Sequence, residues 1–448
     1  MRFHGAAAWT ARLLVSAPLL LASVGGQAAE TGLQISAGIG HSDNIARTAT
    51  DQKSETIGTV GADFGVLQRT SRLDLDVGGN LQWADYFDHT YDSELVGNAV
   101  GKAHFQIVPE RFNWVLQDNF GQSTLDPLAP VTPGNRENVN YLSTGPDLNL
   151  PLGGRTGLRI SGRYDKVDYE TSPVDNDRLK GLVGLVRSIS AGTRVSLDVQ
   201  REKIDFSDNT LNRDYNRDEA FARYEAQGSR TRLGLDIGYS RLQGLTDSPG
   251  GLLTRLELSR QVSPSSVVSL SAGRDFSDSG DSFRLSQSLG GTGQGTISGL
   301  QTGTPFRNTY VAAGWNFSRN RTGLNVNVEH FDESYEGASG LDRKRLTLDA
   351  QLTRNLTPTL IGNVGGALSR EDYDAVTGNY REKTYFAGIT QRFGRRLGIN
   401  AQYQRYRRTS DLAGGGYSEN RVWLNFTWGS TVSRSGFDQQ ALPSDAAL

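Results

Sequence analysis

Apolar and polar residues alternate one by one along most of the chain. The stretch LDLDV at residues 73–77 is the clearest case, with carboxylates between its apolar positions. Successive side chains of a β-strand point to opposite faces, so such a segment has one apolar face and one polar face. Similar segments follow one another from residue 29 to residue 429, without a competing helical period. The pattern predicts an all-β chain whose sheet separates an apolar surface from water.

Two kinds of connection join these segments. Nine short connections alternate with ten longer ones that are rich in Asp, Asn, Gly or Ser. Outer-membrane barrels have this asymmetry, with short periplasmic turns and long extracellular loops, and an even number of strands. We therefore predict a single transmembrane antiparallel up-and-down β-barrel over residues 29–429, with about 20 strands (about 18–20). Its first strand, near residues 32–40, runs outward and its last, near 421–429, returns, so both ends face the periplasm.

Aromatic residues end several of the apolar stripes that we assign to the outer surface. Examples are Tyr164, Tyr239, Tyr403 and Trp428. Amphipathic rings lie at the headgroup level of membrane proteins and form girdles there. Aromatic residues are also good strand formers, which is the alternative explanation. We favour the girdles.

The polar face of the predicted strands carries charges of both signs. A charge facing lipid at the membrane midplane costs about 2–4 kcal/mol, so these side chains must face water or one another. The lumen-lining candidates are Asp74, Asp76, Lys102, Arg159, Arg163, Arg223, Glu225, Arg232, Asp236, Arg255, Glu257, Arg345 and Asp349. They form either a ladder of ion pairs that holds the wall rigid or a hydrophilic conduit for polar cargo. Phe221, Phe386 and Trp423 share this face, where they stack on sugar rings or fill gaps.

The two ends of the chain differ from the barrel region. Positive charge at Arg2 and Arg12, the apolar stretch 13–24 and small residues before Ala29 predict a signal peptide over residues 1–28. An N-terminal membrane anchor is the alternative, but the apolar stretch is shorter than a spanning helix requires. Residues 430–448 form a polar periplasmic tail that is disordered or contacts a partner.

Composition excludes several classes of protein. The 448 residues carry 47 basic and 49 acidic side chains, a balance without the basic patch of a nucleic-acid-binding protein. The absence of cysteine excludes disulfides, thiolate metal sites and thiol nucleophiles. No mature segment approaches the ~20 apolar residues of a membrane-spanning helix.

Searching the sequence for catalytic or metal-binding residues gives little. The histidines are scattered, and the glycine-rich run 290–295 is not followed by the helix that a phosphate-binding loop needs. Asp275, Asp278 and Asp281 offer the oxygen ligands that calcium prefers, but their spacing fits no known calcium loop. We predict no enzyme activity, no metal and no cofactor. The longest connection, residues 278–305, either stays outside or folds inward as a constriction.

Several short motifs resemble one family. They are Gly38–Ile45 where the first strand ends, Asn138–Tyr141 with Gly145-Pro146, the turn Gly153–Thr156, Asp214–Arg217, and Ser229–Leu233. In these motifs the chain resembles the porin-like outer-membrane β-barrels encoded with exopolysaccharide biosynthesis and export systems of Gram-negative bacteria. The resemblance extends over essentially the whole mature chain. It implies a pore-like protein and no catalytic residues.

Three functions follow as hypotheses. The first is a hydrophilic channel of the Gram-negative outer membrane that serves exopolysaccharide export or secretion, with polysaccharide cargo and periplasmic export machinery as partners. The second is a general diffusion porin for small polar solutes. The third is a non-conducting structural barrel that anchors a periplasmic complex. All three are surrounded by outer-membrane lipid and bind no nucleic acid, and the sequence leaves the cargo and the oligomeric state open.

Overall fold

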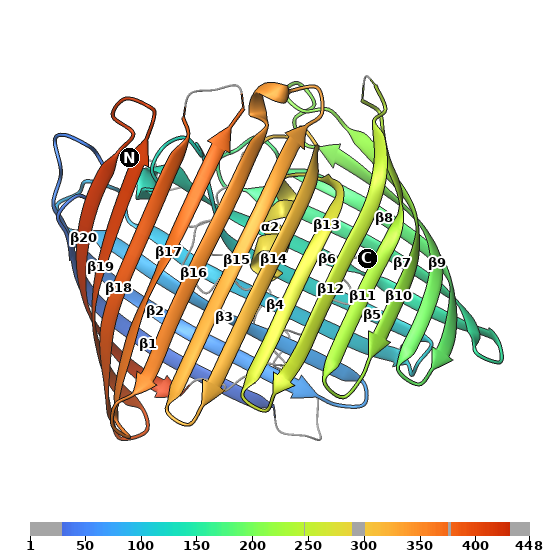
Figure 1. Ribbon diagram of the computed structural model, residues 1–448, viewed down its shortest axis with the longest axis horizontal. Coiled ribbons are helices and arrows are strands. Elements are labelled where there is room, and N and C mark those ends of the chain that lie inside the picture. The colour runs from blue at the N-terminus through green and yellow to red at the C-terminus, as the bar shows by residue number, and fades with distance from the viewer. Residues whose placement is uncertain (1–28, 246, 289–300, 375–377, 431–448) are drawn as a thin grey trace.

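Twenty β-strands close into one barrel (Figure 1). This computed structural model describes residues 29–245, 247–288, 301–374 and 378–430. The signal peptide expected at residues 1–28 and residues 431–448 of the expected tail lie outside the described residues. Among the described helices, none has the length and apolar character needed to cross a membrane.

Each strand pairs antiparallel with the next along the chain, and β20 pairs with β1 to close the sheet. The strands are β1 Glu30–Ser42, β2 Glu55–Arg69, β3 Leu73–Tyr86, β4 Glu94–Val108, β5 Phe112–Thr124, β6 Arg136–Gly153, β7 Thr156–Tyr169, β8 Asn176–Ser190, β9 Thr193–Phe206, β10 Tyr215–Gln227, β11 Thr231–Gln243, β12 Gly250–Ser263, β13 Ser266–Ser277, β14 Phe306–Arg319, β15 Thr322–Tyr335, β16 Arg343–Asn355, β17 Leu360–Tyr373, β18 Tyr380–Phe393, β19 Leu397–Ser410 and β20 Tyr417–Ser430. Short helical segments lie in the longer connections: η2 Pro133–Asn135, α2 Ser279–Ser288 and η3 Ser339–Leu341.

The predicted architecture is confirmed: the barrel is antiparallel, up-and-down and 20-stranded. Short and long connections alternate along it, as the strand bounds show. The first and last strands are longer than expected, and β20 extends to Ser430, one residue into the segment assigned to the tail. The periplasmic position of the short turns stays a prediction.

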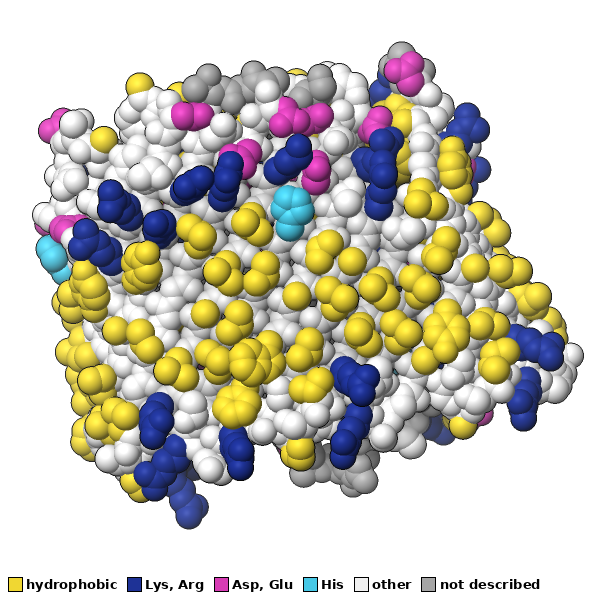
Figure 2. Space-filling model, in the orientation of Figure 1, with side chains coloured by type: hydrophobic (Ala, Val, Ile, Leu, Met, Phe, Trp, Pro, Cys, Tyr) yellow, Lys and Arg dark blue, Asp and Glu magenta, His cyan; other side chains and the backbone are white. Residues whose placement is uncertain are grey.

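The pleat separates an apolar outer face from a polar inner face. Directly paired residues point to the same face of the sheet. Once the direction of one side chain is known, the pairing register therefore gives the inner or outer direction of the others around the barrel. Val60 and Leu197 on the outer face are 61% and 65% exposed, as expected of side chains that meet lipid instead of water. Figure 2 shows hydrophobic side chains as a belt across the middle of the visible face, with charged side chains above and below it. Leu73 and Leu75 share this face but are nearly buried, because neighbouring apolar side chains of β2 to β5 cover them.

Outer aromatic residues form hydrogen bonds on both the long-loop side and the short-turn side of the barrel wall. Towards the long loops, the Tyr164 hydroxyl donates to Asp177 at 2.6 Å and that of Tyr403 to Asn420 at 2.7 Å. Towards the short turns, the Trp315 indole donates to Ser266 at 2.7 Å. Each ring thus combines an apolar body with a satisfied polar tip, which supports the girdle interpretation.

Candidate functional site

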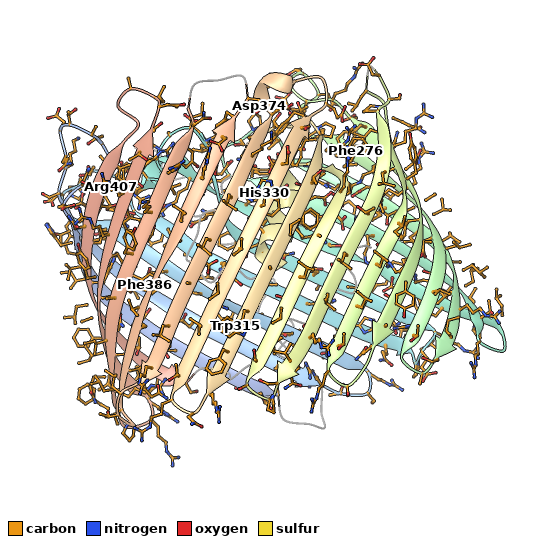
Figure 3. The ribbon with its side chains drawn as sticks, viewed as in Figure 1. Phe276, Trp315, His330, Asp374, Phe386 and Arg407 are labelled. Atoms are coloured by element: carbon orange, nitrogen blue, oxygen red, sulfur yellow. The ribbon has the colours of Figure 1, made fainter. Side chains whose placement is uncertain are left out.

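The lumen is the candidate site, and the register brings the predicted lumen residues to one face. All thirteen charged candidates and the three aromatic candidates lie on the inner face, because each is paired around the barrel with residues that point inward. His330, which Figure 3 labels on β15, has the opposite parity and is exposed on the outer surface. Whether these residues contact a cargo stays a prediction.

Most of the charged candidates are held in ion pairs along the wall. The nitrogen–oxygen distances are 2.8 Å for Arg159–Asp198, Arg163–Asp147, Arg223–Asp236 and Arg255–Asp275, 3.6 Å for Arg194–Glu225 and 3.9 Å for Arg69–Asp74. Asp349 accepts a hydrogen bond from Asn327 at 3.1 Å, and the Arg345 guanidinium lies 4.6 Å from the Phe331 ring centre. Of these six pairs, the four at 2.8 Å, which lie between β6 and β13, are the more buried ones. This part of the wall therefore matches the ladder of ion pairs that the sequence suggested.

The three inward aromatic residues differ in how far they are buried. Phe221 is buried against Leu182 and Leu253 and is 4% exposed. Phe386 and Trp423 are only partly buried. Their rings lie across glycines of neighbouring strands, where a Cβ at Gly365 or Gly40 would come within 2.5 Å of the ring. They fill the space above these glycines and still face the lumen.

A helix, α2, occupies the lumen beside β5 to β8. It belongs to the long connection between β13 and β14, which we expected either to stay outside or to fold inward. The described residues of this connection fold inward (Figure 1). Asp278 caps the helix, since its side chain accepts a hydrogen bond from the Asp281 amide at 3.0 Å. Phe283 packs into an apolar cluster with Val139, Tyr141 and other inward side chains of β6 to β11.

Buried ion pairs hold the start of α2 against the wall. Arg178 of β8 donates to both oxygens of Asp278, at 2.7 and 3.0 Å, and the Tyr215 hydroxyl donates to the same carboxylate at 2.8 Å. Arg217 of β10 donates to Asp281 at 2.7 Å and also bonds Glu202 of β9. All these charged side chains are at most one-tenth exposed. Bidentate, desolvated pairs of this kind are strong when complete and costly when broken.

These contacts also answer the calcium hypothesis. Asp275, Asp278 and Asp281 do not converge on a common point; each binds an arginine instead, Arg255, Arg178 and Arg217 respectively. Within the described ranges, no group of three or more His, Cys, Asp or Glu side chains is arranged to hold a metal ion. The glycine-rich run 290–295 lies outside the described residues.

The anchoring of α2 should not depend on pH in the neutral to mildly acidic range. Burial alone would raise the pKa of the Asp281 carboxyl, but Arg217, Arg178 and Arg284 outweigh it and hold this pKa well below its ordinary value. A lowered folded-state pKa contributes stability at every pH above the unfolded value of about 3.9 and loses it only on further acidification. We expect equal single-channel conductance at about pH 8 and about pH 5 in constant salt. A conductance increase on acidification over this interval would contradict the anchoring.

A small cavity of about 100 Å³ lies between α2 and the inner face of β8 to β14. Its lining includes Lys180, Arg223, Glu257, Arg284 and Tyr310. Charges of both signs line it, so it favours neither anions nor cations and has room for only a few water molecules. It separates the helix from the wall rather than forming a ligand pocket.

A second segment, residues 125–135 between β5 and β6, also folds inward. The Arg47 guanidinium donates to the carbonyl of Val131 at 2.7 Å, and Arg408 donates to that of Ala129 at 2.9 Å. Arg47 comes from the loop after β1 and Arg408 from β19, so the segment reaches across five intervening strands. The Asn135 side chain stabilises the fold of this segment: it accepts a hydrogen bond from the Asp126 amide and donates to the carbonyls of Asp126 and Pro130. The long-loop end of the lumen is therefore narrowed from two sides.

The wall opposite α2 has different chemistry. Over the short-turn half of β14 to β20 the inward side chains are mainly amides, hydroxyls and glycines. We call its main members the amide wall: Asn316, Asn325, Asn327, Gln351, Asn363, Asn400, Gln402 and Asn425, with Phe386 and Trp423. All of them are partly exposed, in contrast to the buried pairs around α2. Amides offer both donors and acceptors, so this surface can bind uncharged hydroxyl groups.

Parity in the sequence found the inward charges but missed the anchoring residues. Arg178, Glu202 and Arg217 were not among the candidates, although each shares the period-two pattern of its strand. The amide wall was missed as well, because the predicted lumen residues were only charged and aromatic ones. Counting inward Asn and Gln by the same parity would have revealed it.

One family model matches part of the chain. The family is described as "Putative beta-barrel porin 2", and the match covers residues 314–429, about a quarter of the chain, from the middle of β14 to the end of β20. No curated protein matches the chain in sequence. With the closed 20-stranded barrel, the family match indicates an outer-membrane, porin-like β-barrel, and it agrees with the prediction of a channel or transporter rather than an enzyme.

Several solved structures align with most of the chain. A mutant ferric enterobactin receptor (PfeA) of Pseudomonas aeruginosa aligns with a TM-score of 0.46 and 11% identity, covering 90% of this chain and 81% of that one. OccK2 (OpdF) of the same organism, in complex with glucuronate, aligns at 0.37 and 10%, covering 90% and 98%. The FrpB iron transporter of Neisseria meningitidis aligns at 0.44 and 10%, covering 89% and 81%.

Proposed function

We propose that this protein is an outer-membrane channel that passes hydroxyl-rich, largely uncharged polymer, and that it serves exopolysaccharide export. The observation that carries the proposal is the division of the lumen. One side is filled by α2 and its buried ion pairs, and the other presents the partly exposed amide wall. A polar surface with few charges suits the repeated weak contacts of a moving polysaccharide better than the fixed charge ring of an ion-selective pore.

Phe386 and Trp423 strengthen this proposal. Both project from the amide wall and retain partial exposure, so an apolar ring face is available beside hydrogen-bonding amides. A sugar ring has the same mixture of apolar and hydroxyl surface. The motifs that resemble barrels encoded with exopolysaccharide systems point in the same direction. The general porin remains the second candidate, since it uses the same barrel.

Matched tryptophans on one strand offer a direct test. Trp423→Ala removes an inward ring and Trp428→Ala an outward ring of β20. In planar bilayers containing the purified protein, a neutral exopolysaccharide fragment should block the current, and Trp423→Ala should raise the half-blocking concentration several-fold. The Trp428→Ala protein should behave like the unaltered protein. Equal effects of the two substitutions would remove the support for a binding role of the amide wall.

Deletion of the gene separates the two candidate functions in cells. Loss of surface polysaccharide with normal uptake of small solutes is the outcome expected of an export channel. Reduced small-solute uptake with normal surface polysaccharide would establish the general porin instead.

A further inference from the structure

The short-turn edge of the barrel carries a ring of exposed arginines. Each of the nine short turns, taken with its adjoining strand ends, contributes at least one. We define the arginine ring as Arg72, Arg111, Arg155, Arg187, Arg230, Arg260, Arg319, Arg321, Arg354, Arg395 and Arg396. Over the same turns and strand ends the acidic residues are Glu110, Asp74, Asp76 and Glu225, and Asp74 and Glu225 are paired with Arg69 and Arg194, which we do not count in the ring. The edge is therefore strongly positive, although the whole chain has a net charge of only -2.

Four members of the ring point sideways toward the membrane. Arg187, Arg260, Arg319 and Arg354 lie near the ends of their strands with the outward parity of the apolar belt. Figure 2 shows basic side chains along the lower border of this belt. The outward Trp315, which Figure 3 labels near the same border, marks the headgroup level. These guanidiniums thus lie where lipid phosphates lie.

At the opposite edge, several outward cations are paired with carboxylates of the same edge. There the outward-facing Arg201 lies 3.4 Å from Asp218, Lys203 lies 2.8 Å from Asp205, and Arg370 lies 2.7 Å from Asp372. The short turns offer almost no carboxylates for such pairs. Positive charge that the protein does not balance attracts anions from the surroundings.

We propose that the arginine ring binds the phosphate headgroups of anionic glycerophospholipids. A guanidinium binds phosphate through two parallel hydrogen bonds, and a basic cluster beside a membrane gains on the order of fivefold in affinity per residue. Four ring members point outward in the plane of the membrane, where lipid headgroups lie. An acidic protein would instead approach the short turns along the barrel axis, so this direction favours lipid. With short turns in the periplasm, the ring meets the phospholipid leaflet and orients the barrel in it.

The test compares two sets of four substitutions with equal change of charge. The ring variant is Arg187→Gln, Arg260→Gln, Arg319→Gln and Arg354→Gln. The control variant changes four outward arginines near the long-loop edge, Arg241→Gln, Arg274→Gln, Arg381→Gln and Arg407→Gln. Each protein is purified in mild detergent, checked for heat-modifiable migration, and mixed with phosphatidylglycerol and phosphatidylcholine before native mass spectrometry. Parallel samples contain lipid A or inorganic phosphate.

We expect the unaltered and control proteins to retain phosphatidylglycerol preferentially, and the ring variant to lose this preference by about tenfold or more. Equal retention by the ring variant and the unaltered protein would overturn the proposal and leave an acidic protein as the partner of the ring. A preference for lipid A over phosphatidylglycerol would overturn the assigned lipid. Displacement of phosphatidylglycerol by millimolar inorganic phosphate alone would show an unspecific anion site.

Discussion

Replacing both carboxylates that anchor α2 is expected to open the channel. The variant Asp278→Asn, Asp281→Asn removes the charges of α2 that Arg178 and Arg217 bind. Arg178 then keeps Glu202 as a carboxylate partner, and Arg217 keeps Glu202 and Glu219. Breaking a buried ion pair costs about 3–5 kcal/mol, enough to shift a two-state equilibrium by about 10²–10³-fold. Single-channel conductance in planar bilayers should rise roughly twofold or more, because a 20-stranded barrel without a filling segment encloses open water.

A control variant removes two carboxylates from the rim of the barrel instead. Asp374→Asn, Asp411→Asn changes the same net charge at exposed positions in the long-loop connections. Its conductance should match that of the unaltered protein. A well-folded anchor variant with unchanged conductance would contradict the view that α2 narrows the pore.

A cross-link provides the converse experiment. A Cβ at Gly121 of β5 would meet the Gln287 side-chain nitrogen of α2, so the two positions are close. The chain contains no cysteine, so Gly121→Cys, Gln287→Cys introduces the only thiols. Joining them with a short bifunctional thiol reagent should return the anchor variant to the conductance of the unaltered protein. The single-cysteine variants treated with the same reagent should stay open.

Substituting Arg178 is expected to cause a large loss of stability. Its guanidinium is 1% exposed and faces Asp278, Asp281 and Glu202. Arg178→Met leaves these carboxylates without their shared partner in a desolvated region, and an uncompensated buried charge costs about 3–5 kcal/mol. The free energy of unfolding, measured by urea titration of tryptophan fluorescence in liposomes, should fall by that amount.

The matched control is Arg201→Met on β9. Arg201 is 61% exposed on the outer face and lies 3.4 Å from Asp218, a surface pair worth at most about 1 kcal/mol. The double variant Arg178→Met, Asp278→Leu should recover part of the loss, because both charges of the strongest pair are then absent. If the two single substitutions lowered the free energy of unfolding equally, the buried ion pairs around Arg178 would not contribute more stability than a surface pair.

Prediction from the sequence succeeded where the information is local. Strand alternation at residues 73–77 and its repeats depends only on the pleat, so parity assigned Asp76, Arg223 and Trp423 to the inner face. Connection lengths, read directly from the chain, led to the correct number of strands. Parity does not tell how far a side chain is exposed, so it did not separate the buried Phe221 from the partly exposed Phe386.

The anchoring of α2 had no such local pattern. Arg178 and Asp278 are 100 residues apart, and they meet only because the closed register brings β8 and the segment after β13 to the same part of the lumen. Along the chain, these carboxylates showed only the oxygen ligands that calcium prefers, at a spacing that fits no known calcium loop. Which arginine neutralises each carboxylate depends on the side chains that face it from other strands.

The sequence by itself determined the 20-stranded barrel and its oily and wet faces, because a strand's period and the length of a turn are properties of adjacent residues. Only the tertiary structure decided what fills the lumen. The segment that begins at Asp278 can stay in water or fold inward. Folding inward costs the free energy of desolvating its charges and gains that of pairing them with Arg178 and Arg217. These arginines lie close enough for this pairing only in the closed barrel.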